Sequence, residues 1–250
     1  MMITKIHCKV IIALAFLLLG SGMARAQFTD GSTGLLQMPT AEMQDDGTFM
    51  ITNNFLNKHS LSPVYWSYNT FQYGINISLW HRVEIGYVCT ILNGAWDPRP
   101  DKSEYMTIMR NQDRHFIGKL LLLREGEFGQ TWMPALAIGA SDPFTSGDGG
   151  YTNISNINGS GNGYFNRFFL ILSKHFSSPV GKLGVHAGYQ FNHRTDYPIN
   201  GPCVGVNWEP VWLQRKGILD NLGVILEYDA RTVNVGFLAS IWNNRFEAMF

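Results

Sequence analysis

Residues 71–92 constrain the fold of this chain more than any other stretch. Two runs of nine residues, 71–79 and 83–91, alternate with a period of two and are separated by three residues. Two alternating runs joined by a tight turn predict an antiparallel β-hairpin. The apolar phase consists of Phe71, Tyr73, Ile75, Ile77, Leu79, Val83, Ile85, Tyr87, Cys89 and Ile91. The opposite phase consists of Gln72, Gly74, Asn76, Ser78, Glu84, Gly86, Val88 and Thr90.

The length of these strands indicates a membrane. Strands of soluble proteins average about 5–6 residues, whereas a strand that crosses a bilayer needs about 9–11. One phase is wholly apolar and the other is small or polar except at Val88, as expected if one face meets lipid and the other an aqueous interior. Trp80, at the turn, has the position of an interfacial aromatic residue. We therefore predict that the hairpin is part of a transmembrane β-barrel.

The first 26 residues have the pattern of a secretory signal peptide. Lys5 and Lys9 precede an apolar run at 10–19, and Ala-Arg-Ala ends at Ala26. This order predicts cleavage between Ala26 and Gln27. The expected domains are a signal peptide at 1–26 and a single outer-membrane β-barrel domain at 27–250.

Composition narrows the class of protein further. The chain has 19 basic residues, and without Lys5, Lys9 and Arg25 the 16 that remain face 19 acidic ones, a formal charge of −3. That balance argues against nucleic acid as a partner. Charged residues make up 15% of the chain, against about 25% in soluble domains. A barrel whose outer wall faces lipid needs few solubilising charges.

The remaining strands follow from the same alternation. They are predicted at 48–55, 116–123, 134–141, 164–174, 183–191, 203–208, 222–229 and 233–240, with a short last strand up to Phe250. Residues 35–38 could add one more before Pro39, which offers no N–H to a ladder. The fold class is therefore an all-β antiparallel transmembrane β-barrel of about 10–12 strands, with an even number favoured. Long loops (57–66, 93–114, 142–163) alternate with short ones (80–82, 125–130, 177–182), as in outer-membrane barrels.

The chain ends on an aromatic residue. Phe246, Ala248 and Phe250 share one phase, which resembles the C-terminal signal that the outer-membrane insertion machinery reads. Phe250 is therefore the candidate insertion signal. The alternative is that Phe250 is simply a frayed chain end.

Titratable residues on the inner phases do not form a recognisable catalytic set. His186, Glu84, Glu227 and Glu247 are predicted to face the interior, and the sequence places no serine beside His186. Nucleophilic catalysis needs such a neighbour, so we expect these groups to pair with one another. Asp142 and Asp148 lack the spacing of calcium loops. We predict no catalytic residue, no cofactor and no metal.

The two cysteines of the mature chain are expected to remain free. Cys89 lies on the predicted outer phase and Cys203 on the inner one. Cysteines on opposite faces of a sheet cannot be bridged without moving backbone.

Three fragments carry a family resemblance. They are Gly-Leu-Leu-Gln-Met-Pro-Thr-Ala at 34–41 with Gly-Thr-Phe at 47–49, the run 119–125 leading into 134–139, and 222–229 followed by Asn-Val-Gly at 234–236. With them the chain resembles the YjbH-type outer-membrane proteins linked to exopolysaccharide biosynthesis. The motif positions are Gly34, Leu35, Met38 and Pro39. The resemblance brings no catalytic residues.

The resemblance implies a non-enzymatic protein of the cell outer membrane that takes part in exopolysaccharide production or export. Its expected partners are outer-membrane lipids, the insertion machinery, and exopolysaccharide with its export proteins. The alternative is a small general porin or structural barrel unrelated to polysaccharide. A lipid-modifying barrel enzyme is a third hypothesis.

Overall fold

The computed structural model describes residues 27–61, 68–92, 111–143, 145–146, 152–153, 164–194, 197–213, 219–242 and 244–250. The predicted signal peptide, with Ala26 at its cleavage site, lies outside the described residues, as does Asp148. Among the described residues, no helix is long and apolar enough to cross a bilayer. The only helices there are three 3-10 turns, at Lys58–Ser60, Glu127–Gly129 and Val211–Leu213.

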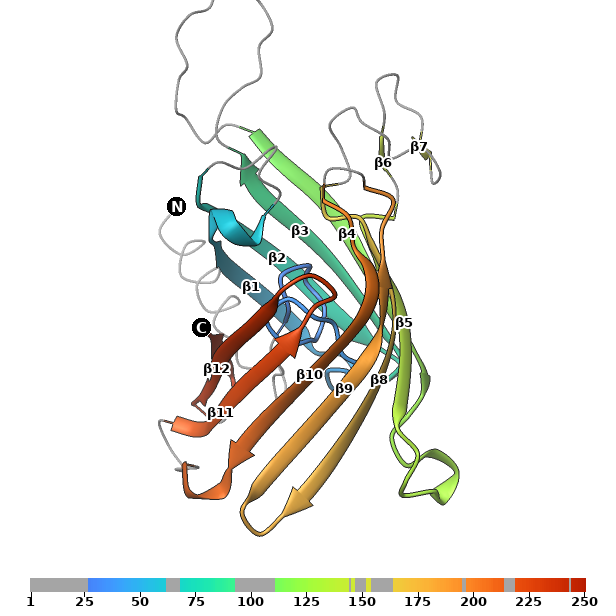
Figure 1. Ribbon diagram of the computed structural model, residues 1–250, viewed down its shortest axis with the longest axis vertical. Coiled ribbons are helices and arrows are strands. Elements are labelled where there is room, and N and C mark those ends of the chain that lie inside the picture. Colours follow the sequence, from blue (N-terminus) through green and yellow to red (C-terminus); the bar gives the residue numbers. More distant parts are fainter. Residues whose placement is uncertain are drawn as a thin grey trace, which may run out of the picture.

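One antiparallel sheet dominates the described part of the chain. In spatial order its eleven strands are β1(Phe49–Leu56), β2(Thr70–Leu79), β3(Val83–Leu92), β4(Asn111–Leu123), β5(Ala135–Ser141), β8(Arg167–Ser178), β9(Gly181–Phe191), β10(Asn200–Pro210), β11(Leu219–Tyr228), β12(Val233–Ile241) and β13(Phe246–Met249). A separate pair, β6(Thr145–Ser146) and β7(Thr152–Asn153), lies in the connection between β5 and β8. The sheet curves strongly, so that β1–β3 and β10–β12 enclose a common interior (Figure 1). Its edges are β1 and β13, between which the described residues record no ladder.

The predicted hairpin is confirmed. Ile75 pairs with Tyr87 and Ser78 with Glu84 across β2 and β3. The connection has three residues, and Arg82 N–H donates to Leu79 O (3.1 Å). Trp80 and His81, the two central residues of this turn, both have positive φ (56° and 53°), as in the type I′ turns typical of hairpins. Along β2 the polar phase is buried and the apolar phase exposed, and Ile75 keeps 45% of its surface. The interior of the sheet is therefore its polar side.

Aromatic side chains on the outer surface gather towards the two ends of the strands. Trp80, Phe128, Trp132, Trp212 and Trp242 are exposed at the end with the short connections. Towards the other end two ring pairs contact across neighbouring strands, Phe55–Phe71 and Phe168–Phe191, with centroids 5.3 Å and 5.1 Å apart. Exposed aliphatic residues such as Ile75, Leu120, Leu170 and Leu226 lie between.

The structure corrects four strand predictions. Residues 35–38 form no ladder, because Leu35 N–H donates to Met38 O (2.8 Å) within a tight bend. β4 begins at Asn111, five residues before the predicted start. The early part was missed because the inner phase there is polar (Asp113, His115), which resembles a loop in sequence. The predicted loop 142–163 contains β6 and β7. The large sheet has eleven strands in its described part, which lies within the predicted 10–12 but is not the even number that was favoured.

The two described cysteines, Cys89 and Cys203, are both free and both buried. Cys89 shares its phase of β3 with Ile85 and Tyr87, as predicted, but its side chain is buried. In the ladder it is flanked by Tyr73 and Arg114, two much larger side chains. Glu247, predicted to face the interior, is half-buried opposite Ser240.

Candidate functional site

Residues 27–44, which we call the inner segment, occupy the interior of the curved sheet. Figure 1 shows this blue stretch coiled between β1–β3 and the strands β10–β12. It makes only two isolated bridges, Gln27–Thr33 and Gly34–Pro39, yet Phe28 and Met38 are fully buried. A buried backbone without a ladder must find hydrogen-bond partners elsewhere. Charged side chains of the sheet supply many of them.

The first anchor is the ion pair of Glu84 on β3 and Lys119 on β4. These residues are directly opposite in the ladder, their charged atoms are 3.0 Å apart, and both side chains are fully buried. The Glu84 carboxylate accepts hydrogen bonds from Thr33 N–H (2.9 Å), Thr33 Oγ1 (2.6 Å) and Gln44 N–H (2.9 Å). Lys119 Nζ donates to Thr33 O (3.0 Å) and Glu42 O (2.6 Å). The carboxylate of this pair therefore accepts hydrogen bonds from the inner segment, and its ammonium donates hydrogen bonds to it.

The second anchor is Glu227 on β11. Its carboxylate accepts hydrogen bonds from Leu36 N–H (3.1 Å), Gln37 N–H (2.7 Å) and the Asn234 amide (2.9 Å). Asn234 lies directly opposite Glu227 on β12, so the ladder sets the carboxylate's position. Glu84 and Glu227 therefore hold the inner segment from opposite parts of the sheet.

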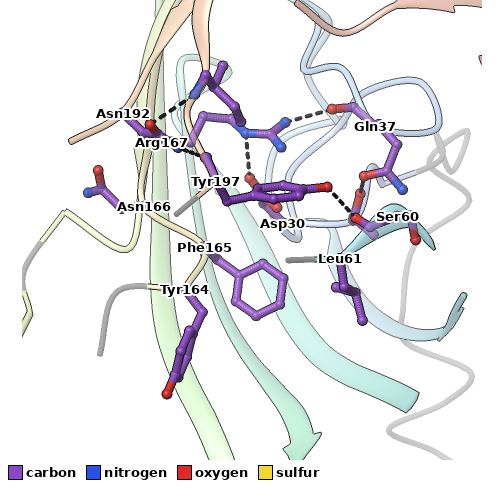
Figure 2. Close-up of a pocket in the computed structure, with 12 residues that line it drawn as sticks. Asp30, Gln37, Ser60, Leu61, Tyr164, Phe165, Asn166, Arg167, Asn192 and Tyr197 are labelled. Carbon is purple, nitrogen blue, oxygen red and sulfur yellow. Dashed lines mark hydrogen bonds and ion pairs between the residues drawn. The ribbon is translucent and has the colours of Figure 1, made fainter. Parts of the chain in front are cut away.

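The third anchor is Arg167 on β8. Its guanidinium donates to Gln37 O (2.6 Å) and lies 3.2 Å from an Asp30 carboxylate oxygen. Figure 2 shows Arg167 between these two residues, with Tyr197 nearby donating to Ser60 O (2.9 Å). The cavity beside them has a volume of about 30 Å³. That is room for about one water and too little for a sugar ring.

The fourth anchor is a row of three polar residues on β8, β9 and β10. Ser173 Oγ accepts a hydrogen bond from Ala41 N–H (2.8 Å) and lies 2.7 Å from His186 Nδ1. His186 Nε2 lies 2.9 Å from Asn207 Oδ1. The expectation that no serine accompanies His186 is wrong, because the β8–β9 register places Ser173 directly opposite it. Ser173 is only 1% exposed, and its hydroxyl contacts both the inner segment and His186.

Glycines of the wall make room for the inner segment. A Cβ on Gly205 of β10 would overlap the Leu35 side chain and lie 3.2 Å from Met38 Sδ. Gly31 itself has φ +98°, and a Cβ there would overlap Val88. The wall and the inner segment approach so closely at these two contacts that one of the two partners must be a very small residue.

Gly205→Val is expected to displace the inner segment. Overpacking a filled interior costs about 1–3 kcal/mol. Limited proteolysis of the folded protein should then cut within residues 27–44 faster than in the unmodified protein. Gly118→Val is the matched control, since a Cβ on Gly118 meets nothing within 4 Å. Equal cleavage of the two variants would show that the interior does not depend on this contact.

Asp142 is a buried carboxyl group directly after the end of β5, and its burial disfavours the charged form. Burial raises its pKa to about 7, with smaller opposing effects from His115 (lowering) and Asp113 (raising). Because the folded-state pKa exceeds the ordinary value of 3.8, folding takes up a proton between about pH 4 and 7. The contribution of Asp142 to the free energy of unfolding is therefore greatest below about pH 4 and falls as the pH rises towards 7.

Asp142→Asn should remove that pH dependence. The residue has φ 45°, a conformation that asparagine also tolerates. We expect the free energy of unfolding to rise at pH 8 and to change little at pH 4, which denaturant titrations at the two pH values would measure. A loss of stability at pH 8 would contradict the assignment.

The family-motif positions all lie in the inner segment. Gly34, Leu35, Met38 and Pro39 are buried, and the Leu35–Met38 bend is closed by the hydrogen bond described above. Gln27, next to the predicted cleavage site, is the first described residue and is also buried. The motif positions pointed to the family, but nothing in their sequence pattern indicated that the segment lies in the interior. Its four anchors come from strands far apart in sequence.

Comparison with known proteins confirms the family resemblance that these positions carried. The family described as exopolysaccharide biosynthesis protein YbjH (YjbH) matches residues 27–234, which include the inner segment and most of the sheet. No curated protein and no solved structure matches the chain.

Proposed function

Because the chain belongs to the YjbH exopolysaccharide biosynthesis family, we propose that it is an outer-membrane β-barrel protein that helps exopolysaccharide to be made or exported, without being an enzyme. The family match carries the link to exopolysaccharide. The membrane, the barrel and the export role are our proposals. They rest on the two faces of the sheet.

The outer face supports a place in lipid. It presents exposed aliphatic residues between two groups of aromatic side chains, the arrangement that bacterial barrels have at the two membrane interfaces. The buried face instead carries Glu84, Lys119, Glu227 and Arg167. A soluble protein would have the opposite polarity, with charges outside and apolar side chains inside.

The inner segment favours an export component over a general porin. A porin needs a water-filled lumen, whereas four groups of buried side chains hold residues 27–44 inside this sheet. In the proposed function, polysaccharide or a partner passes only when this segment moves. The lipid-modifying enzyme receives little support, because Ser173 and His186 face the interior rather than lipid.

Deletion of the gene tests the proposal directly. We expect secreted exopolysaccharide to fall and to recover when the gene is supplied again. Unchanged polysaccharide would contradict the family-based function. Fractionation tests the location separately, since a protein found only in a soluble fraction would contradict the membrane proposal.

Deletion of Phe250 is expected to reduce assembly. Its backbone N–H and C=O both pair with Phe237 (3.0 Å each), so the residue extends the β12–β13 ladder rather than fraying. Its side chain is 77% exposed, as an insertion signal must be if it is to be read. We expect less protein in the outer membrane, measured by immunoblot, and Phe250→Tyr should retain the wild-type level because the aromatic ring remains. A deleted form at wild-type level would refute the role of Phe250.

A further inference from the structure

We propose that Glu42, His175 and His186 form a binding site for a divalent transition-metal ion, which would join the inner segment to the sheet. Glu42 belongs to the inner segment, His175 to β8 and His186 to β9. One potential ligand atom from each lies within 4.8 Å of the other two. The inference rests on this geometry and not on the role in polysaccharide export.

The three atoms are close enough to share an ion. Three points within 4.8 Å of one another always have a common point no farther than about 2.8 Å from each (4.8 Å divided by √3). Zinc binds imidazole nitrogen and carboxylate oxygen at about 2.0–2.2 Å. Each atom would therefore move inward by less than about 1 Å. Three protein ligands leave a fourth position for water.

His175 is already oriented as a metal ligand. Its Nδ1 lies 2.6 Å from Glu125 Oε2, and metal-binding histidines commonly donate their second ring N–H to a carboxylate. Glu125 is in turn held by Lys174 Nζ (2.8 Å) and by the backbone N–H of His175 (3.0 Å). These contacts fix the ring and direct Nε2 towards Glu42.

The other nitrogen of His175 faces Glu42. Nε2 is buried and lies 2.6 Å from Glu42 Oε1, as an ion pair. A metal ion would replace this contact and take both atoms as ligands. His186 would give up its contact to Ser173 Oγ or to Asn207 Oδ1 to bind the same ion.

Access and charge also suit a cation. The His175 side chain keeps 31% of its surface, so an ion can reach the site. His175 is near the end of β8 that leads into the short connection to β9. With neutral imidazoles, Glu42 supplies one negative charge to the ion, and the nearby Glu125 carboxylate, which also pairs with the Lys174 ammonium, adds to the negative potential at the site. Imidazole and carboxylate ligands suit zinc, and cobalt(II) is a spectroscopic substitute.

Zinc binding to the folded protein in detergent micelles tests the site. We expect one zinc per chain by calorimetry, and slower proteolysis within residues 27–44 when zinc is present. His175→Gln and Glu42→Gln should each weaken binding by about tenfold or more, and Glu125→Gln by about 10–100-fold, as for carboxylates that orient ligands. His59→Gln, at an exposed histidine outside the site, should bind zinc as the unmodified protein does.

The competing possibility is that His175 is a charged imidazolium bridging Glu42 and Glu125. In that case zinc would not bind, or would bind equally to His175→Gln and Glu42→Gln, and either result would overturn the proposal. If neither variant folds, cobalt(II) in the unmodified protein decides. Intense visible absorption of a four- or five-coordinate ion supports the site, and the weak spectrum of six-coordinate aqueous cobalt refutes it.

Discussion

Glu84→Gln should destabilise the folded protein by about 3–5 kcal/mol, the cost of breaking a buried ion pair from one side. The substitution keeps the shape of the side chain but leaves the Lys119 ammonium, which is fully buried, without its counter-ion. It also weakens the acceptor for Thr33 and Gln44, so the inner segment loses an anchor. Denaturant titration in micelles would measure the free energy of unfolding, and limited proteolysis would report on residues 27–44.

A double-mutant cycle separates the pair from its surroundings. Lys119→Met should be costly alone, and the two substitutions together should cost less than the sum of the single changes, by about 0.5–3 kcal/mol. Asp46→Asn is the surface control. Asp46 and His81 are 4.0 Å apart and largely exposed, and such pairs contribute less than about 1 kcal/mol. Additive effects of Glu84→Gln and Lys119→Met would show that the pair does not act as a unit.

Alternation in the sequence predicted most of the strands but not the contents of the interior. Period two placed the β2–β3 hairpin correctly because a sheet with one apolar face repeats that pattern at every second residue. It failed at the start of β4, where Asp113 and His115 are buried in a polar interior. Polar residues on an inward phase look like a loop when no apolar neighbour marks the opposite phase.

The interior was expected to be aqueous, and in the structure the inner segment lies within it (Figure 1). The local sequence of residues 27–44 does not predict an interior position, because the partners Glu84, Ser173 and Glu227 are up to 191 positions away. Inner-phase glycines such as Gly205 were the available signal, since they leave space that another part of the chain must fill. Glu84 forms an ion pair with Lys119, but Glu227 and His186 are held by uncharged groups rather than by the other predicted inner charges. The serine beside His186 required the register of β8 and β9.

Ile75→Arg is expected to prevent most of the protein from reaching a folded, membrane-inserted state. Ile75 lies near the middle of β2 on the outer face, with Ile51 and Tyr87 beside it on the neighbouring strands. Under the proposed membrane location, arginine at the bilayer midplane costs about 2–4 kcal/mol, a large share of a typical stability of 5–15 kcal/mol. The shift of the folded band on unheated gels, compared with boiled samples, would measure the folded fraction in outer-membrane extracts.

The choice of control decides what this experiment can show. An inward substitution such as Asn76→Arg is unsuitable, because Asn76 is buried and donates to Gly31 O (2.9 Å), so it would disturb the inner segment. Thr131→Arg adds the same charge at an exposed position in the connection between β4 and β5. It should leave the folded fraction nearly unchanged, because a charge near the membrane interface costs only about 0–1 kcal/mol. If the Ile75 and Thr131 variants fold equally well, the outer face does not meet lipid and the membrane proposal fails.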